Sequence, residues 1–221
     1  MKIRVGLLFF VLVQLHVFGA DSLAVRKKFL FAGLNSVAYK GSLSPTYARW
    51  TPSFQFGIAF QKRKILNGML SITFGRFIGE SRDYKLPPTA NSSLQPVNRF
   101  QTDFISLNYD LQILLFQYRA LRVFVSQGVG FMRFTPKDWD GNNLIDRNRT
   151  RNPSEDFNSV ALSFPTQIGL RYSFANGMAF GFQAGWLNVG SNYLDNMDEL
   201  SDNSQGDNLA IYRVQYFLPL K

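Results

Sequence analysis

Apolar and polar residues alternate with a period of two along much of this chain, most clearly over residues 159–186. From Val160 to Phe174 the even positions are almost all apolar, whereas the odd positions are small or polar. Because successive side chains of a strand point to opposite faces, this pattern predicts a strand with one apolar face. Ala175-Asn176-Gly177 predicts a tight turn, since Asn and Gly accept positive φ. The alternation then resumes, so the whole stretch predicts a β-hairpin.

The residue types on the two faces indicate which kind of sheet the hairpin belongs to. A soluble β-sandwich carries Lys, Glu and Thr on its outward face. Here the polar face consists of Gly, Ser, Ala and Gln with an occasional Arg, and the apolar face ends in Tyr and Trp. This is typical of an outer-membrane barrel, which is apolar outside with aromatic girdles and has a small, polar interior. A secreted β-sandwich is the alternative.

The same pattern recurs along the chain and predicts eight strands. They span about residues 28–40, 54–61, 70–75, 100–114, 122–134, 159–174, 178–186 and 210–218. The first strand has apolar residues on both faces, so its facing stays open. Long connections, among them 81–99, 135–157 and 191–207, alternate with short ones, as in an even-stranded barrel. The sequence therefore predicts an all-β fold, an eight-stranded antiparallel transmembrane barrel. Pro165 predicts a bulge within its strand.

The first 19 residues predict a secretory signal peptide. Lys2 and Arg4 precede an apolar run that is too short for a membrane span, and small residues follow. Cleavage after Gly19 is favoured over cleavage after Ala20. The barrel domain then spans residues 20–221. Sec-dependent export to the outer membrane of a Gram-negative bacterium follows from this prediction, and the absence of Cys excludes a lipoprotein signal.

The chain is basic, with a formal net charge of +9. No RNA- or DNA-binding motif accompanies this charge. For an exported chain, lipopolysaccharide and other outer-membrane lipids, or acidic envelope proteins, are therefore better partners than nucleic acid.

Eight strands enclose only enough space for side chains, so the interior is expected to be filled. Buried charges must be paired, which predicts a hydrogen-bonded polar network. Its expected members are Asp110, Gln112, Gln167, Arg171, Gln183, Arg213 and Gln215. A proton or ion path through the same residues is the less favoured alternative.

Catalysis is disfavoured because the one His, His16, lies in the predicted signal peptide. Barrel hydrolases generally need a His base beside a nucleophile or water. Six loop acids could form a dyad or hold a cation, but solvated acids are favoured: Asp138, Asp140, Asp146, Asp195, Asp198 and Glu199. The sequence thus predicts a non-enzymatic protein without a metal or cofactor.

Three short segments resemble the PorG-like family of small outer-membrane barrels. Residues 39–45 are similar to its "Tyr-x-Gly-Asp-Leu-x-Pro" segment, 134–137 to "Phe-Asn-Pro-Lys" and 193–195 to "Tyr-Leu-Asp", although Ser42 replaces the usual Asp. The matching residues are Tyr39, Gly41, Leu43, Pro45, Pro136, Lys137, Tyr193, Leu194 and Asp195. The resemblance implies an outer-membrane partner for a periplasmic ring, made of a lipoprotein and a companion subunit, in the type IX secretion and gliding machinery.

Two functions follow as hypotheses. The first is a scaffold or anchor of an envelope assembly, which would use basic residues expected at the periplasmic end to dock an acidic partner. Those residues are Arg26, Lys27, Lys28, Lys62, Arg63 and Lys64. They could instead merely border the inner leaflet. The second is a surface protein whose long external loops bind a ligand, lipopolysaccharide or another cell.

Overall fold

The computed structural model describes residues 27–41, 44, 46–61, 65–80, 98–145, 158–196 and 207–220. The signal peptide and its cleavage site lie outside these residues and stay predictions. No helix in the described part of the chain is long and apolar enough to cross a membrane.

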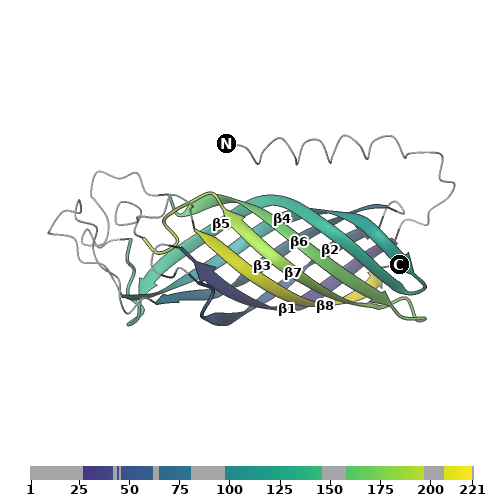
Figure 1. Ribbon diagram of the computed structural model, residues 1–221, viewed down its shortest axis with the longest axis horizontal. Helices are drawn as coiled ribbons and strands as arrows, with labels where there is room; N and C mark the ends of the chain where they lie inside the picture. The colour runs from purple at the N-terminus through teal and green to yellow at the C-terminus, as the bar shows by residue number, and fades with distance from the viewer. Residues whose placement is uncertain are drawn as a thin grey trace.

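Eight antiparallel strands follow one another around a closed barrel, and the last strand pairs with the first. Figure 1 shows them wrapping around one cylinder with a common tilt. This confirms the predicted fold. The strands are β1 (Lys27–Lys40), β2 (Trp50–Gln61), β3 (Leu66–Glu80), β4 (Arg99–Tyr118), β5 (Leu121–Asp138), β6 (Val160–Ser173), β7 (Ala179–Val189) and β8 (Asn208–Leu220).

The two ends of the barrel differ in their connections. The short connections β2–β3, β4–β5 and β6–β7 lie at the end where β1 begins and β8 finishes, and the longer ones lie at the other end. Outer-membrane barrels have short periplasmic turns and long external loops, so we name these the periplasmic end and the external end.

The hairpin of β4 and β5 is longer than the sequence predicts at both ends. Its turn consists of Arg119 and Ala120 alone, with Arg119 at a φ of 52°, and β5 continues to Asp138. The predicted strand end at residue 114 and the predicted loop start at Thr135 were therefore wrong. A register shift between Leu114 and Phe116 explains the first error, because it interrupts the period-two pattern within β4.

Pro165 does not produce the predicted bulge. Gln127 lies opposite Thr166 and Gly130 lies opposite Ser163, so the register of β5 and β6 is the same on both sides of the proline. Only the two intervening pairs are missing from the ladder. A proline removes one N–H donor, and here the sheet accepts that local loss without an inserted residue.

The outward face of the barrel is apolar, as the alternation predicts. On β1 it carries Leu30 and Leu34, which settles the facing of that strand, because Phe29 and Phe31 are buried inside. The exposed aromatic residues on this face include Trp50, Phe54, Phe74, Tyr109, Phe131, Phe164, Tyr172, Phe182, Trp186, Tyr212 and Tyr216. A surface of this size and polarity is stable only in contact with lipid.

The interior forms three layers along the barrel. Near the external end, a buried cluster contains Val37, Tyr39, Phe77, Phe100, Phe104, Met132, Phe134, Leu144, Ala161, Leu187, Val189, Leu194, Leu209 and Ile211. Near the periplasmic end, a smaller cluster contains Phe29, Phe31, Ala59, Met69, Ala179 and Phe217. Polar residues occupy the middle.

The prediction of a small, polar interior was thus wrong at both ends, and at the periplasmic end inward-facing glycines explain why. A Cβ added to Gly57 would come within 2.9 Å of the Phe31 ring, and one added to Gly181 within 2.9 Å of the Phe217 ring. Each glycine makes room for an aromatic ring from another strand. From the sequence alone, the same glycines indicate only that these interior positions are small, and the aromatic rings that occupy the space cannot be inferred.

Because the outward face contacts lipid, the loss of stability caused by a charged substitution on this face should depend on its depth in the bilayer. Leu107 lies midway along β4 and is 48% exposed, whereas Leu220 ends β8 and is 45% exposed. Leu107→Arg should destabilise the barrel by about 2–4 kcal/mol, because the guanidinium would enter the bilayer midplane, and Leu220→Arg by about 0–1 kcal/mol. Urea unfolding in lipid vesicles measures both. Equal costs would contradict the assigned position of the membrane.

Candidate functional site

The structure places all seven residues of the predicted interior network inside the barrel. Their exposed fractions range from 0% for Asp110, Gln183 and Arg213 to 5% for Arg171. They come from inward-facing positions of β4, β6, β7 and β8, which meet in the middle of the barrel and, at Arg171, toward its periplasmic end.

The contacts within this layer are local rather than continuous. The Asp110 and Arg213 side chains form an ion pair at 3.8 Å, and Arg213 Nη1 donates to Gln167 Oε1 at 3.1 Å. Gln215 Nε2 donates to Gln55 Oε1 at 2.9 Å. Gln183 makes no side-chain hydrogen bond with any residue that the structure describes. The layer fills the barrel, but the described side chains do not form one unbroken chain of proton donors and acceptors.

At the external end, the hydroxyl of Tyr39 lies between two carboxylates. Tyr39 Oη is 2.7 Å from Asp207 Oδ1 and 3.0 Å from Asp195 Oδ2. The Tyr39 ring stacks on Phe77 and meets Phe100 edge-on. All three polar residues are buried, with exposed fractions of 0–4%. We call Tyr39, Asp195 and Asp207 the mouth cluster.

The first and third motifs of the resemblance meet at the mouth cluster. Tyr39 belongs to the first motif and Asp195 to the third, although 156 residues separate them. Gly41, also of the first motif, lies so close that an added Cβ would overlap with the Tyr39 hydroxyl and with Asp207. Leu43 and Pro45 lie outside the described residues.

The second motif lies beside the third. Pro136 O accepts a hydrogen bond from Leu144 N at 3.0 Å, and Leu144 O accepts one from Asn196 Nδ2 at 3.1 Å. Thr102, which lies opposite Pro136, donates its hydroxyl to Leu194 O at 2.7 Å. The turn that follows Tyr193 is therefore held down on the barrel, with Leu194 in the external apolar cluster. Lys137 instead faces outward, where its Nζ is 2.7 Å from Asp103 Oδ2.

The prediction of solvated loop acids was wrong for two of the six. Asp195 is fully buried and Asp138 is 7% exposed. Asp138 Oδ1 accepts from the Asn142 backbone N at 2.8 Å, and Gly141 has a φ of 88°. Residues 139–143 therefore form a tight turn closed by a carboxylate. Asp140 is exposed, while Asp146, Asp198 and Glu199 lie outside the described residues.

Burial limits what the mouth cluster can do. A substrate in solution does not reach Asp195, because none of its surface is exposed. Asp207 Oδ2 also accepts from Leu194 N at 2.9 Å, which ties the cluster to the turn above it. The arrangement is a latch that closes the external end, rather than an open acid–base pair.

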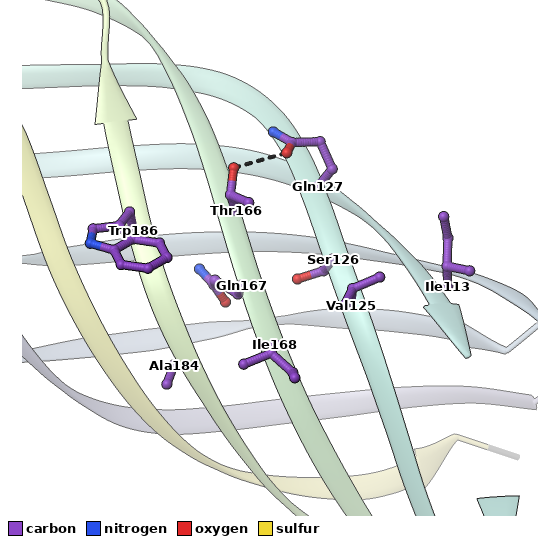
Figure 2. A pocket seen from close by; sticks show the side chains of 9 residues that line it. All are labelled: Ile113, Val125, Ser126, Gln127, Thr166, Gln167, Ile168, Ala184 and Trp186. Atoms are coloured by element: carbon purple, nitrogen blue, oxygen red, sulfur yellow. Dashed lines mark hydrogen bonds between the residues drawn. The ribbon is translucent and has the colours of Figure 1, made fainter. Parts of the chain in front are cut away.

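A hollow on the lipid-facing side lies over β5, β6 and β7, beside the point where the β5–β6 ladder lacks its two pairs. Figure 2 shows its lining, which includes Val125, Ile168 and Trp186, and the hydrogen bond from the Thr166 hydroxyl to Gln127 Oε1, 2.8 Å long. None of the nine lining residues is ionisable. The hollow thus offers an apolar surface to lipid and no acid–base group.

The predicted periplasmic docking residues are described only in part. Lys28 is exposed, and the exposed Arg119 lies in the β4–β5 turn at the same end. Only the backbone of Lys27 is described, and Arg26, Lys62, Arg63 and Lys64 lie outside the described residues.

Sequence reasoning missed Asp207, Leu144 and Asn196 as parts of the closed mouth. Asn196 has a φ of 65°, a backbone conformation that Asn adopts more readily than most residues. An Asn at this position is therefore a weak sequence signal for a turn. Asp207 carried no signal, since an acid in an Asn-rich loop resembles a solvated one.

Comparison with known proteins shows the fold. The chain resembles the attachment invasion locus protein Ail of Yersinia pestis, solved with the heparin analogue sucrose octasulfate (9% identity, 88% of this chain, 99% of that chain, TM-score 0.50). It also resembles Neisserial surface protein A (9% identity, 86% and 96%, TM-score 0.52) and the outer membrane enzyme PagL (14% identity, 86% and 99%, TM-score 0.38). No protein-family model matches the sequence, and no curated protein matches it.

The barrel topology, the apolar exterior and these likenesses define the class of the protein. It is an eight-stranded barrel of the outer-membrane type. At these identities the comparisons show the fold alone. The PorG-like resemblance and the absence of catalysis stay predictions.

The mouth cluster predicts a specific cost for removing one oxygen atom. Tyr39→Phe should destabilise the barrel by about 1–3 kcal/mol, because two buried carboxylates lose their shared donor. Tyr172→Phe is the matched control, since Tyr172 is exposed to lipid and its hydroxyl makes no hydrogen bond with a described residue. Urea unfolding measures both variants. A cost for Tyr39→Phe no larger than that of the control would contradict the latch.

Proposed function

We propose that the protein is a non-enzymatic outer-membrane anchor that docks an envelope protein assembly at its periplasmic end. The observation that carries the proposal is the closed interior. Apolar clusters occupy the barrel near both ends, a buried polar layer lies between them, and the mouth cluster latches the external turn. A barrel filled in this way offers surfaces for binding rather than a channel for solutes.

The PorG-like resemblance supplies the kind of assembly. The motif residues Tyr39, Gly41 and Leu194 all belong to the closed external mouth, so they favour a shared barrel architecture. On this proposal the partner is a periplasmic ring of a lipoprotein and its companion subunit, as in type IX secretion and gliding. The basic residues of the periplasmic end would attract its acidic surface.

A cluster of charges on the outside of the barrel supports lipopolysaccharide as the surrounding lipid. Arg76 Nε is 2.5 Å from Asp103 Oδ1, and Lys137 Nζ is 2.7 Å from Asp103 Oδ2. Arg133 lies on the same outward face of β5, two residues nearer the midplane than Thr135, which is paired with Asp103. One carboxylate thus holds two cations, with a third close by. The group lies at the external edge of the apolar band, where phosphate groups of lipid A would lie.

The docking proposal predicts that charge reversal at one turn releases the partner. Changing Lys62, Arg63 and Lys64 to Glu should reduce recovery of the periplasmic partner in pull-downs from solubilised membranes by about tenfold or more. The matched control reverses Arg147, Arg149 and Arg151, three cations in the β5–β6 connection at the opposite end. Heat-modifiable gel mobility shows that both variants fold.

The same experiment distinguishes the surface-binding hypothesis. If the variant reversed at residues 62–64 still retrieves the partner while the variant reversed at residues 147, 149 and 151 loses it, the proposal of docking at the periplasmic end is wrong. The external loops would then carry the function.

The lipid proposal has its own test. Arg76→Gln combined with Lys137→Gln should weaken binding of purified lipid A by roughly tenfold, because two charge-assisted contacts to phosphate are lost. Lys28→Gln combined with Arg119→Gln removes the same charge at the periplasmic end and should leave binding unchanged. Native mass spectrometry of the detergent-solubilised protein measures the bound fraction. Equal loss in both variants would indicate a general charge effect without a site.

A further inference from the structure

Two arginines face each other inside the periplasmic end of the barrel. Arg122 of β5 and Arg171 of β6 are direct partners in the antiparallel ladder, and both side chains belong to the inward-facing set of their strands. Arg171 is 5% exposed, whereas Arg122 is half-buried. Like charges placed directly opposite each other destabilise a sheet, so this pair needs compensation.

The described residues provide no negative charge for the pair. Arg122 Nε donates to Gln117 Oε1 at 3.1 Å, and Arg171 Nη2 donates to Gln112 Oε1 at 3.2 Å. Both acceptors are neutral. Asp110, the next inward acid along β4, is within 3.8 Å of Arg213. Neither Arg122 nor Arg171 makes an ion pair with any residue that the structure describes.

Other contacts satisfy Arg171 only in part. Its guanidinium lies 4.1 Å from the centre of the Phe217 ring and 5.8 Å from that of Phe124. A ring face attracts a cation, but it does not neutralise it. Arg171 Nε is buried and has no acceptor among the described residues. Burial of a cation with an unused donor is costly unless an anion accompanies it.

A small cavity adjoins both arginines. It is lined by Asn67, Gln112, Leu114, Arg122, Phe124 and Arg171. Its size leaves room for about one water-sized group. Two guanidinium groups, a side-chain amide from β3 and another from β4 therefore surround a space for a single small particle. No carboxylate lines it.

We propose that this cavity is a binding site for a small monovalent anion of the size of chloride. The anion would lie between Arg122 and Arg171, accept hydrogen bonds from both, and cancel the charge that the pair leaves uncompensated. Phosphate and sulfate need several times the volume of one water, so the room fits a chloride-sized anion better. The site would be reached from the periplasmic end, where Arg122 is partly exposed. This inference does not depend on the docking proposal, since it concerns the inward face of the barrel.

The test compares the thermal unfolding of the purified, detergent-solubilised protein in chloride and in gluconate at equal ionic strength. A ligand that binds only the folded barrel raises its unfolding midpoint. Chloride at about five times its Kd should raise the midpoint by about 2–4 °C, and above the Kd the midpoint should keep rising with the logarithm of the chloride concentration. Gluconate is too large for the cavity and serves as the reference anion. An identical midpoint in both salts at all concentrations overturns the proposal.

Variants then locate the effect. Arg171→Gln should abolish the difference between chloride and gluconate, whereas Arg119→Gln, which removes an exposed arginine in the neighbouring turn, should retain it. If Arg171→Gln does not fold, Arg122→Gln replaces it, since that side chain is only half-buried. Retention of the chloride effect in the folded variant, or its equal loss in Arg119→Gln, would place the anion elsewhere and overturn the site. In crystals grown with bromide, the anomalous peak should lie between Arg122 and Arg171.

Discussion

Pairing of β1 with β8 is the interaction on which the rest of the structure depends. It runs from Lys28 opposite Leu220 to Lys40 opposite Asn208, and it leaves no open edge in the sheet. In hydrocarbon every backbone N–H and C=O needs an internal partner, which only a closed barrel gives to strands. Closure also assigns each residue to the lipid or to the interior, because successive side chains alternate. The apolar exterior and the crowded interior are two results of one constraint.

The sequence predicted the fold where this constraint leaves an unambiguous pattern. On β6, and on β7 as far as Trp186, the exterior is apolar and the interior small or polar, so the facing can be read directly. The pattern fails where both faces are apolar, as around Phe29 and Phe31, and where a register shift interrupts it, as at Leu114 and Phe116. It also cannot show that Gly57 stands beside a ring of another strand. These errors share a cause, since each depends on a neighbour that is distant in sequence.

Prediction of the mouth cluster and of the arginine pair from the sequence has the same limit. The motifs identified Tyr39 and Asp195 separately, but a contact between residues 156 positions apart follows only from the way the loops return to the barrel. Asp207 completes the mouth cluster without any local signal. Arg171 was predicted to lie inside, yet its position opposite Arg122 depends on the register of β5 and β6. A shift of one residue would turn one of the two side chains toward lipid.

The ionisable side chains inside the barrel are ordered along its axis. Carboxylates lie at the external end in the mouth cluster, the Asp110–Arg213 ion pair lies in the middle, and Arg122 and Arg171 lie toward the periplasmic end. The external carboxylates are covered by a turn that their own hydrogen bonds hold in place. The periplasmic arginines line a cavity next to a half-buried side chain, so their charge lies nearer to solvent. Because unscreened charge attracts its opposite from the side on which it is accessible, this order agrees with the proposed anion site and the proposed acidic partner at the periplasmic end.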